Sequence, residues 1–109
     1  MPELRPERVR VLGIDIEVRY VDELEDCLGS FDATELEIQV LDGLSAENTR
    51  LVLWHELTHV VEVLLELKVS EGAICAFSTG FIQMMRDNPI LAAWSFGAPR
   101  LTPPHPSES

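Results

Sequence analysis

The chain has few basic residues and no long apolar run. Of its 109 residues only 8 are lysine or arginine, against 19 aspartates and glutamates, which gives a formal net charge of −11. Such a surface repels phosphate backbones, so direct nucleic-acid binding is not expected. The apolar runs are far shorter than the roughly 20 residues of a transmembrane helix, so we expect no membrane span.

Cysteine is also scarce. The chain has two, Cys27 and Cys75, which are too few for the disulfide framework of a small secreted domain. The chain does not open with a basic segment followed by an apolar one, so no secretory signal is visible. A reducing cytoplasm is the simplest setting for this sequence.

The length predicts a single domain with its own core. The hydrophobic content of 46% is sufficient for folding. We expect this domain to occupy residues 1–96. Residues 97–109 are rich in proline and serine, and we expect them to form a disordered tail.

Alternation of apolar and polar residues predicts three β-strands. Residues 14–20 alternate strictly and would turn their apolar side chains to the core. Residues 9–12 are β-like and would pair with them as a hairpin. Residues 36–40 alternate again, and an Asp-Gly turn follows. The acidic segment 21–34 lacks this pattern and is expected to be a loop, with a helical turn at 22–28 as an option.

Two long helices and a short one are expected after the strands. Ser45 suits an N-cap, and the helix that follows runs to about Leu67. It is apolar around most of its circumference, which is typical of a central helix. Ser70 caps a second helix, which ends before Asn88-Pro89, where a short last helix begins. The fold class is therefore α+β, a small three-stranded sheet packed on the central helix and a second, antiparallel helix.

The central helix carries an H-E-x-x-H motif at residues 55–59. His55 and His59 are four residues apart, so they lie on one face of the helix and can reach the same small cation. Neutral imidazole nitrogen suits zinc. A bound zinc ion lowers the pKa of a water molecule from about 15.7 towards about 7, so that the carboxylate of Glu56 can take its proton. The motif therefore predicts zinc-assisted hydrolysis, most often of a peptide bond.

The plain alternative is a buried helix that happens to carry two histidines. Burying imidazoles and a carboxylate without partners costs several kcal/mol, and a metal ion removes that problem. Glu62 lies one turn after His59 on the same face. It is either an outer partner of the site, a spare ligand or a solvated surface charge.

The third metal ligand has two candidates. A catalytic zinc ion takes three protein ligands, and a histidine six residues after His59 is absent because Leu65 stands there. The second helix offers Cys75 and Glu71. In an antiparallel helix pair Cys75 lies closer to the level of His59, since Glu71 sits beside the turn. We favour Cys75, with Glu71 as the alternative because its side chain is longer and crossing helices bring different levels together.

These features resemble the small phage-type and bacterial metallopeptidases of the ImmA/IrrE-like, minimal gluzincin group. The resemblance covers most of the chain, from the hairpin to the start of the last helix. It rests on Leu36-Glu37-Ile38, Leu44-Ser45, His55-Glu56-Leu57-Thr58-His59, Lys68-Val69-Ser70-Glu71 and Arg86-Asp87-Asn88-Pro89.

The resemblance implies a zinc-dependent peptidase whose strand at 36–40 is the sheet edge that holds an extended substrate. In gluzincins the third ligand is a glutamate, followed three residues later by a small residue. Here Cys75, followed by Ser78, stands at the best-matching position, and Glu71 matches an acidic position one turn earlier. This departure leaves open ligation by Cys75, a shift to Glu71, or an impaired enzyme.

Zincins also use a tyrosine or histidine outside the motif to stabilise the oxyanion. The chain has one tyrosine, Tyr20, and one further histidine, His105, and Arg86 is a third option. Tyr20 suits the core better, and His105 falls in the expected tail. We assign this role to none of the three.

The leading prediction is a cytoplasmic zinc metallopeptidase acting on a peptide or protein, with a phage or stress repressor as one candidate substrate. The alternative is a non-catalytic zinc-binding domain, closed by both histidines, Cys75 and either Glu71 or Glu62. A third option is an interaction module that adds a partner's strand to its sheet edge. The small core and Trp94 near the chain end also suggest a homodimer.

Overall fold

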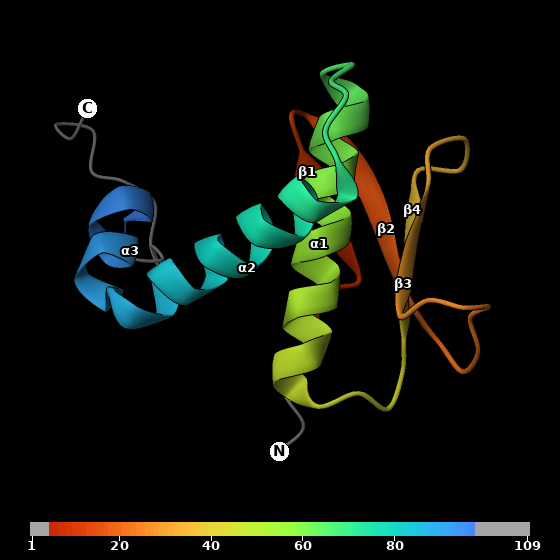
Figure 1. The fold of residues 1–109 in the computed structure, drawn as a ribbon, viewed down its shortest axis with the longest axis horizontal. Coiled ribbons are helices and arrows are strands. Elements are labelled where there is room, and N and C mark those ends of the chain that lie inside the picture. Colours follow the sequence, from red (N-terminus) through yellow and green to blue (C-terminus); the bar gives the residue numbers. More distant parts are fainter. Residues whose placement is uncertain (1–4, 98–109) are drawn as a thin grey trace, which may run out of the picture.

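The computed structural model describes residues 5–97. All of its strands precede all of its helices in the chain (Figure 1). The strands are β1 (Arg8–Val11), β2 (Ile14–Val21), β3 (Gly29–Asp32) and β4 (Glu37–Leu41). The helices are α1 (Ala46–Leu64), α2 (Glu71–Asp87) and α3 (Pro89–Phe96). The expected α+β class is confirmed. Apart from Gly97, the expected disordered tail lies outside the described residues.

The sheet has four strands, one more than expected, in the order β1-β2-β4-β3. β1 and β2 form the predicted antiparallel hairpin, β2 and β4 run parallel, and β4 and β3 run antiparallel. The additional strand, β3, lies in the segment expected to be a loop. Its sequence, Gly-Ser-Phe-Asp, has a single large apolar side chain, so no alternation marks it. It forms because its backbone pairs with β4, from Gly29 opposite Val40 to Asp32 opposite Glu37.

β3, and not the strand at residues 36–40, forms the sheet edge beside the motif-bearing helix. β4 covers most of that range and lies between β2 and β3, so both of its backbone edges are already paired. The expectation that residues 36–40 are an open substrate-binding edge is therefore wrong. The cause is the chain segment between β2 and β4, which returns along the outside of the sheet and closes that edge.

One apolar core joins the sheet to α1. Its buried members come from β2, β4 and α1, and are Ile16, Val18, Ile38, Val40, Leu53 and Val60. The predicted inward face of β2 is confirmed at its centre, whereas Ile14 beside the hairpin turn is 38% exposed. Because removal of this apolar surface from water is the main force between the two layers, it also fixes the rotation of α1 and the direction in which its histidines point.

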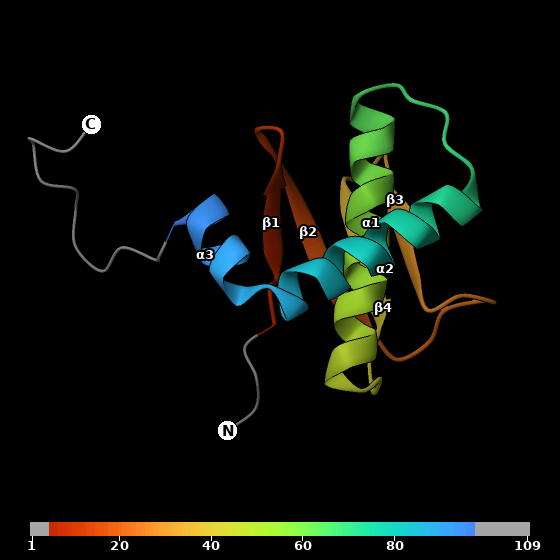
Figure 2. The same cartoon turned by 60° about the vertical axis from the view of Figure 1, so that its left-hand side comes forward.

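α2 returns to the middle of α1 because α1 ends early. α1 stops at Leu64, earlier than predicted, and Glu66 adopts a left-handed φ of 55°, which reverses the chain. Residues 65–70 then run back beside α1 (Figure 1). Ser70 caps α2 as predicted, with its Oγ accepting a hydrogen bond from the backbone N–H of Ala73 at 3.1 Å. α2 crosses α1 steeply instead of lying antiparallel along it (Figure 2).

α3 continues from the end of α2 and, among the described elements, contacts only α2. None of its residues is buried. In the described part of the chain, no helix combines the length and the apolar character that crossing a bilayer requires.

Candidate metal centre

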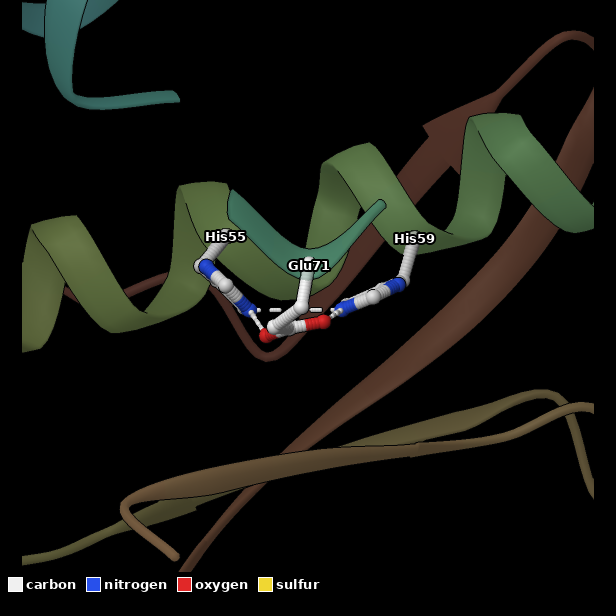
Figure 3. Close-up of side chains that lie close together, drawn as sticks. All are labelled: His55, His59 and Glu71. Carbon is white, nitrogen blue, oxygen red and sulfur yellow. Dashed lines mark hydrogen bonds and ion pairs between the residues drawn. The ribbon is translucent and has the colours of Figure 1, made fainter. Parts of the chain in front are cut away.

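His55 and His59 project from one face of α1 toward Glu71, the first residue of α2 (Figure 3). Glu71 places Oε1 at 2.6 Å from His55 Nε2 and Oε2 at 3.1 Å from His59 Nε2. The two Nε2 atoms are 3.2 Å apart. The helical spacing brings the two rings together as predicted, and the steep crossing of α2 adds the carboxylate.

This group fits a metal ion. Its ligand atoms all lie within 4.8 Å of one another. Ligands held about 2.0–2.1 Å from a tetrahedral zinc ion lie about 3.3 Å from each other, a spacing close to that of these three residues. In this structure Glu71 contacts both Nε2 atoms directly. A divalent cation can replace these contacts, because a carboxylate oxygen and an imidazole nitrogen that carries no proton each have a lone pair to donate to it.

Glu62 contacts the second ring nitrogen of His59. Its Oε1 lies 3.0 Å from His59 Nδ1, and its Oε2 accepts a hydrogen bond from the backbone N–H of Val69 at 2.8 Å. The contact with Val69, and to a smaller degree the contact with His59, lower the pKa of Glu62. When His59 donates its Nδ1–H to Glu62, its Nε2 lone pair is left free for a metal. This is the contact that an outer partner of the site makes.

Cys75, the sequence-based choice for third ligand, lies on the opposite side of the His55 ring from Glu71. Its Sγ is 3.6 Å from His55 Nδ1, whereas Glu71 contacts Nε2. A group at Nδ1 orients the ring and does not share a metal with Nε2. The structure therefore assembles the alternative set, with Glu71. The preference for Cys75 assumed antiparallel helices, and the early end of α1 removes that assumption.

Glu56 lies in the same cavity as the three candidate ligands. The cavity has a volume of about 370 Å³, and Glu56 is only 7% exposed. Burial raises the pKa of Glu56, because a carboxylate loses solvation there, while the neighbouring His55 and His59 act in the opposite direction. A carboxyl group with a raised pKa suits both proton acceptance and proton donation near neutral pH.

Gly29 allows β3 to approach α1 closely beside Glu56. A Cβ at this position would lie 2.5 Å from Val52 Cγ1 and 3.2 Å from Glu56 Cγ. Gly29 and Cys27 both line the cavity. Neither was predicted as a site residue, because both fall in the segment expected to be a loop. Only the glycine itself offered a signal, since a conformationally free residue often marks a close backbone approach.

The residues considered for oxyanion stabilisation make other contacts. The Tyr20 hydroxyl donates to the carbonyl of Pro6 at 2.8 Å, and Arg86 pairs with Glu47 at 2.8 Å. Neither Tyr20 nor Arg86 lines the cavity. His105 lies outside the described residues. The role therefore stays unassigned.

Compared with protein-family models, with curated proteins and with solved structures, the chain has no match. The resemblance to ImmA/IrrE-like metallopeptidases therefore stays a prediction from the motif and its neighbouring segments. The geometry itself defines a class, an α+β domain in which two histidines of one helix and a glutamate of the next form a candidate metal centre.

Proposed function

We propose that the protein is a zinc-dependent metallopeptidase in which His55, His59 and Glu71 bind the metal. The observation that carries this proposal is the convergence of three ligand side chains beside the buried carboxyl of Glu56. Three protein ligands leave one position of a tetrahedral zinc ion open, as in catalytic sites. In this position zinc would act as a Lewis acid and would lower the pKa of a water molecule.

Glu56 is the proposed general base. It takes a proton from the attacking water and returns it to the leaving amine, so it acts first as a base and then as an acid. The raised pKa of Glu56, caused mainly by burial, brings its two protonation states closer in free energy near neutral pH. Glu62 and Cys75 are positioning residues in this proposal, because each lies at the Nδ1 atom of one histidine.

β3 is the proposed docking strand for the substrate. It is an edge of the sheet, and Gly29 at its start lines the same cavity as Glu56. An extended peptide that pairs with β3 through main-chain hydrogen bonds would pass this cavity. The substrate class is therefore an unfolded peptide or protein segment, such as an exposed linker of a repressor. The setting is the cytoplasm, which agrees with free Cys27 and Cys75.

The test combines metal content with cleavage of an unfolded protein. The zinc-loaded protein should cleave it, removal of zinc with a chelator should stop cleavage, and added zinc should restore it. Glu56→Gln should keep its zinc and lose at least about 100-fold in rate. Glu35→Gln, at an exposed glutamate outside the cavity, is the matched control and should keep full activity. Cleavage that persists unchanged in Glu56→Gln would reject the proposal.

A non-catalytic zinc-binding domain is the second candidate, and one observation favours it. Among the described residues that line the cavity there is no tyrosine and no third histidine to stabilise an oxyanion. Glu62 and Cys75 now contact the Nδ1 atoms of the histidines, so this candidate requires one of them to turn to the Nε2 side and become the fourth ligand. This candidate predicts stoichiometric zinc with no cleavage, and an X-ray absorption spectrum with four protein ligands.

A further inference from the structure

An apolar groove lies between β1, α1 and α2, on a different face of α1 from the candidate metal centre. Its volume is about 720 Å³, and Arg10 is the only charged residue in its described lining. It shares no lining residue with the cavity around Glu56. The proposed function therefore makes no use of this groove.

Three aromatic side chains form one wall of the groove. The ring centroid of Phe81 lies 5.2 Å from that of Trp54 and 6.1 Å from that of Phe77. Phe77 is 64% exposed, and Leu12 at the hairpin turn of the β1 wall is 61% exposed. Exposed apolar surface gathered in a hollow marks an interaction site more often than scattered apolar residues do.

α3 presents a second apolar surface that nothing in the described chain covers. Its sequence, Pro-Ile-Leu-Ala-Ala-Trp-Ser-Phe, contains no charged residue. Ile90 and Trp94 are one turn apart on the same face, and they are 85% and 82% exposed. Helices shorter than about 12 residues are marginal in water without tertiary packing. An eight-residue helix with this exposed face therefore needs a surface to bind.

We propose that α3 of one copy of the chain binds in the groove of a second copy, and that α3 of the second copy binds in the groove of the first. Each copy offers one helix and one groove, so two identical contacts close a two-fold symmetric dimer. α3 lies at the end of α2 that points away from α1 and the sheet (Figure 1), which favours exchange between chains over folding back.

The distribution of acidic residues and the contact area fit a second copy as the occupant. A net charge of −11 opposes association of identical chains over most of the surface. Neither α3 nor the described groove lining contains an aspartate or glutamate, so this contact avoids the repulsion. A buried Trp or Phe contributes about 150–250 Å². Trp94 and Ile90 of both copies, with the groove surface that they cover, reach about 1,200 Å², the lower end of the range for specific interfaces.

The experiment measures the mass of the full chain by sedimentation equilibrium, with circular dichroism as a check of folding. The native chain should be a dimer. Ile90→Glu on α3 and Phe77→Glu in the groove should each raise the dimer dissociation constant at least about 30-fold. Both side chains are largely exposed in the single chain, so its folding should not depend on them. Leu65→Glu, at an exposed leucine outside the groove, adds the same charge and should leave the dimer intact.

Mixing the two variants distinguishes this contact from a contact between two α3 helices. The Ile90→Glu chain keeps an intact groove and the Phe77→Glu chain keeps an intact α3. The mixture can therefore form one intact helix–groove contact, so it should form heterodimers under conditions in which each variant alone is monomeric. A monomeric native chain, or a Phe77→Glu variant that remains dimeric, would overturn the proposal. Zinc content should be equal in all these variants, so failure of the dimer and failure of the metal centre are separate results.

Discussion

Glu62 Oε2 accepts a hydrogen bond of 2.8 Å from the backbone N–H of Val69, so the motif-bearing helix also holds the linker that leads to Glu71. The other oxygen of Glu62 lies 3.0 Å from His59 Nδ1. Because the Glu71 side chain is 66% exposed, its position depends on this linker more than on burial. The carboxylate of Glu62 thus connects His59 to the linker that positions Glu71.

Glu62→Gln should lower zinc affinity about 10- to 100-fold, the range typical of outer partners of metal ligands. His59 and Val69 contact different oxygens of Glu62, and the amide of glutamine presents an acceptor oxygen to only one of these two positions. The measurement is competition for zinc with a chromophoric chelator. Glu66→Gln, an exposed change just after α1, is the control and should bind zinc as the native chain does. Equal zinc affinities of Glu62→Gln and Glu66→Gln would show that Glu62 does not support the metal ligands.

Glu71→Ala should lose zinc more severely than the roughly 100-fold that marks an outer partner. Cys75→Ala should keep one zinc ion per chain with a smaller loss of affinity, because its Sγ lies at His55 Nδ1 and not at the Nε2 side. Elemental analysis after dialysis checks both variants. Zinc lost only in Cys75→Ala would return the third-ligand role to the cysteine.

Gly29→Ala should destabilise the protein by about 1–3 kcal/mol, as overpacking does. The added methyl group meets Val52 and Glu56 at distances that real Cβ atoms rarely show, so β3 has to move away from α1. Cleavage should fall as well, since β3 is the proposed docking strand. Gly80→Ala in α2 has open space and should stabilise the helix by about 0.5–1 kcal/mol. Urea unfolding of both variants measures the difference, and a neutral Gly29→Ala would contradict the close approach.

Glu56→Gln should stabilise the metal-free protein at neutral and alkaline pH. Burial raises the pKa of Glu56 above its ordinary value of 4.5, so the folded state binds the proton more tightly than the unfolded state. The stability of the native chain therefore falls as pH rises from 4.5 through the raised pKa. Thermal unfolding at several pH values should show an advantage of Glu56→Gln that grows with pH in this window. An advantage independent of pH would indicate a cause other than the charge.

Much of the site was predictable because it is encoded locally. The four-residue spacing of His55 and His59 places both rings on one face of any helix, whatever that helix packs against. The side chains of Ser45 and Ser70 cap the two long helices as predicted, since an N-cap needs only a hydroxyl and nearby backbone N–H groups. These features depend on residues within one or two turns of each other.

The choice between Glu71 and Cys75 was not predictable in this way. It depends on where α1 ends, on the left-handed backbone at Glu66 and on the angle at which α2 then crosses α1. A change of a few residues in the helix end moves the following chain by several ångströms, because each helical residue adds about 1.5 Å. The sequence pattern does not specify that endpoint.

The sequence alone determined the α+β class, the hairpin, the central helix and the pair of histidines with Glu56 between them. The tertiary structure decided that β3 closes the sheet beside that helix, that Gly29 brings β3 against Glu56, and that Glu71 reaches both histidines. The physical reason is the distance along the chain between the residues that interact. Periodicity and capping act between near neighbours in the chain, whereas strand order and helix crossing follow from the joint burial of distant apolar side chains.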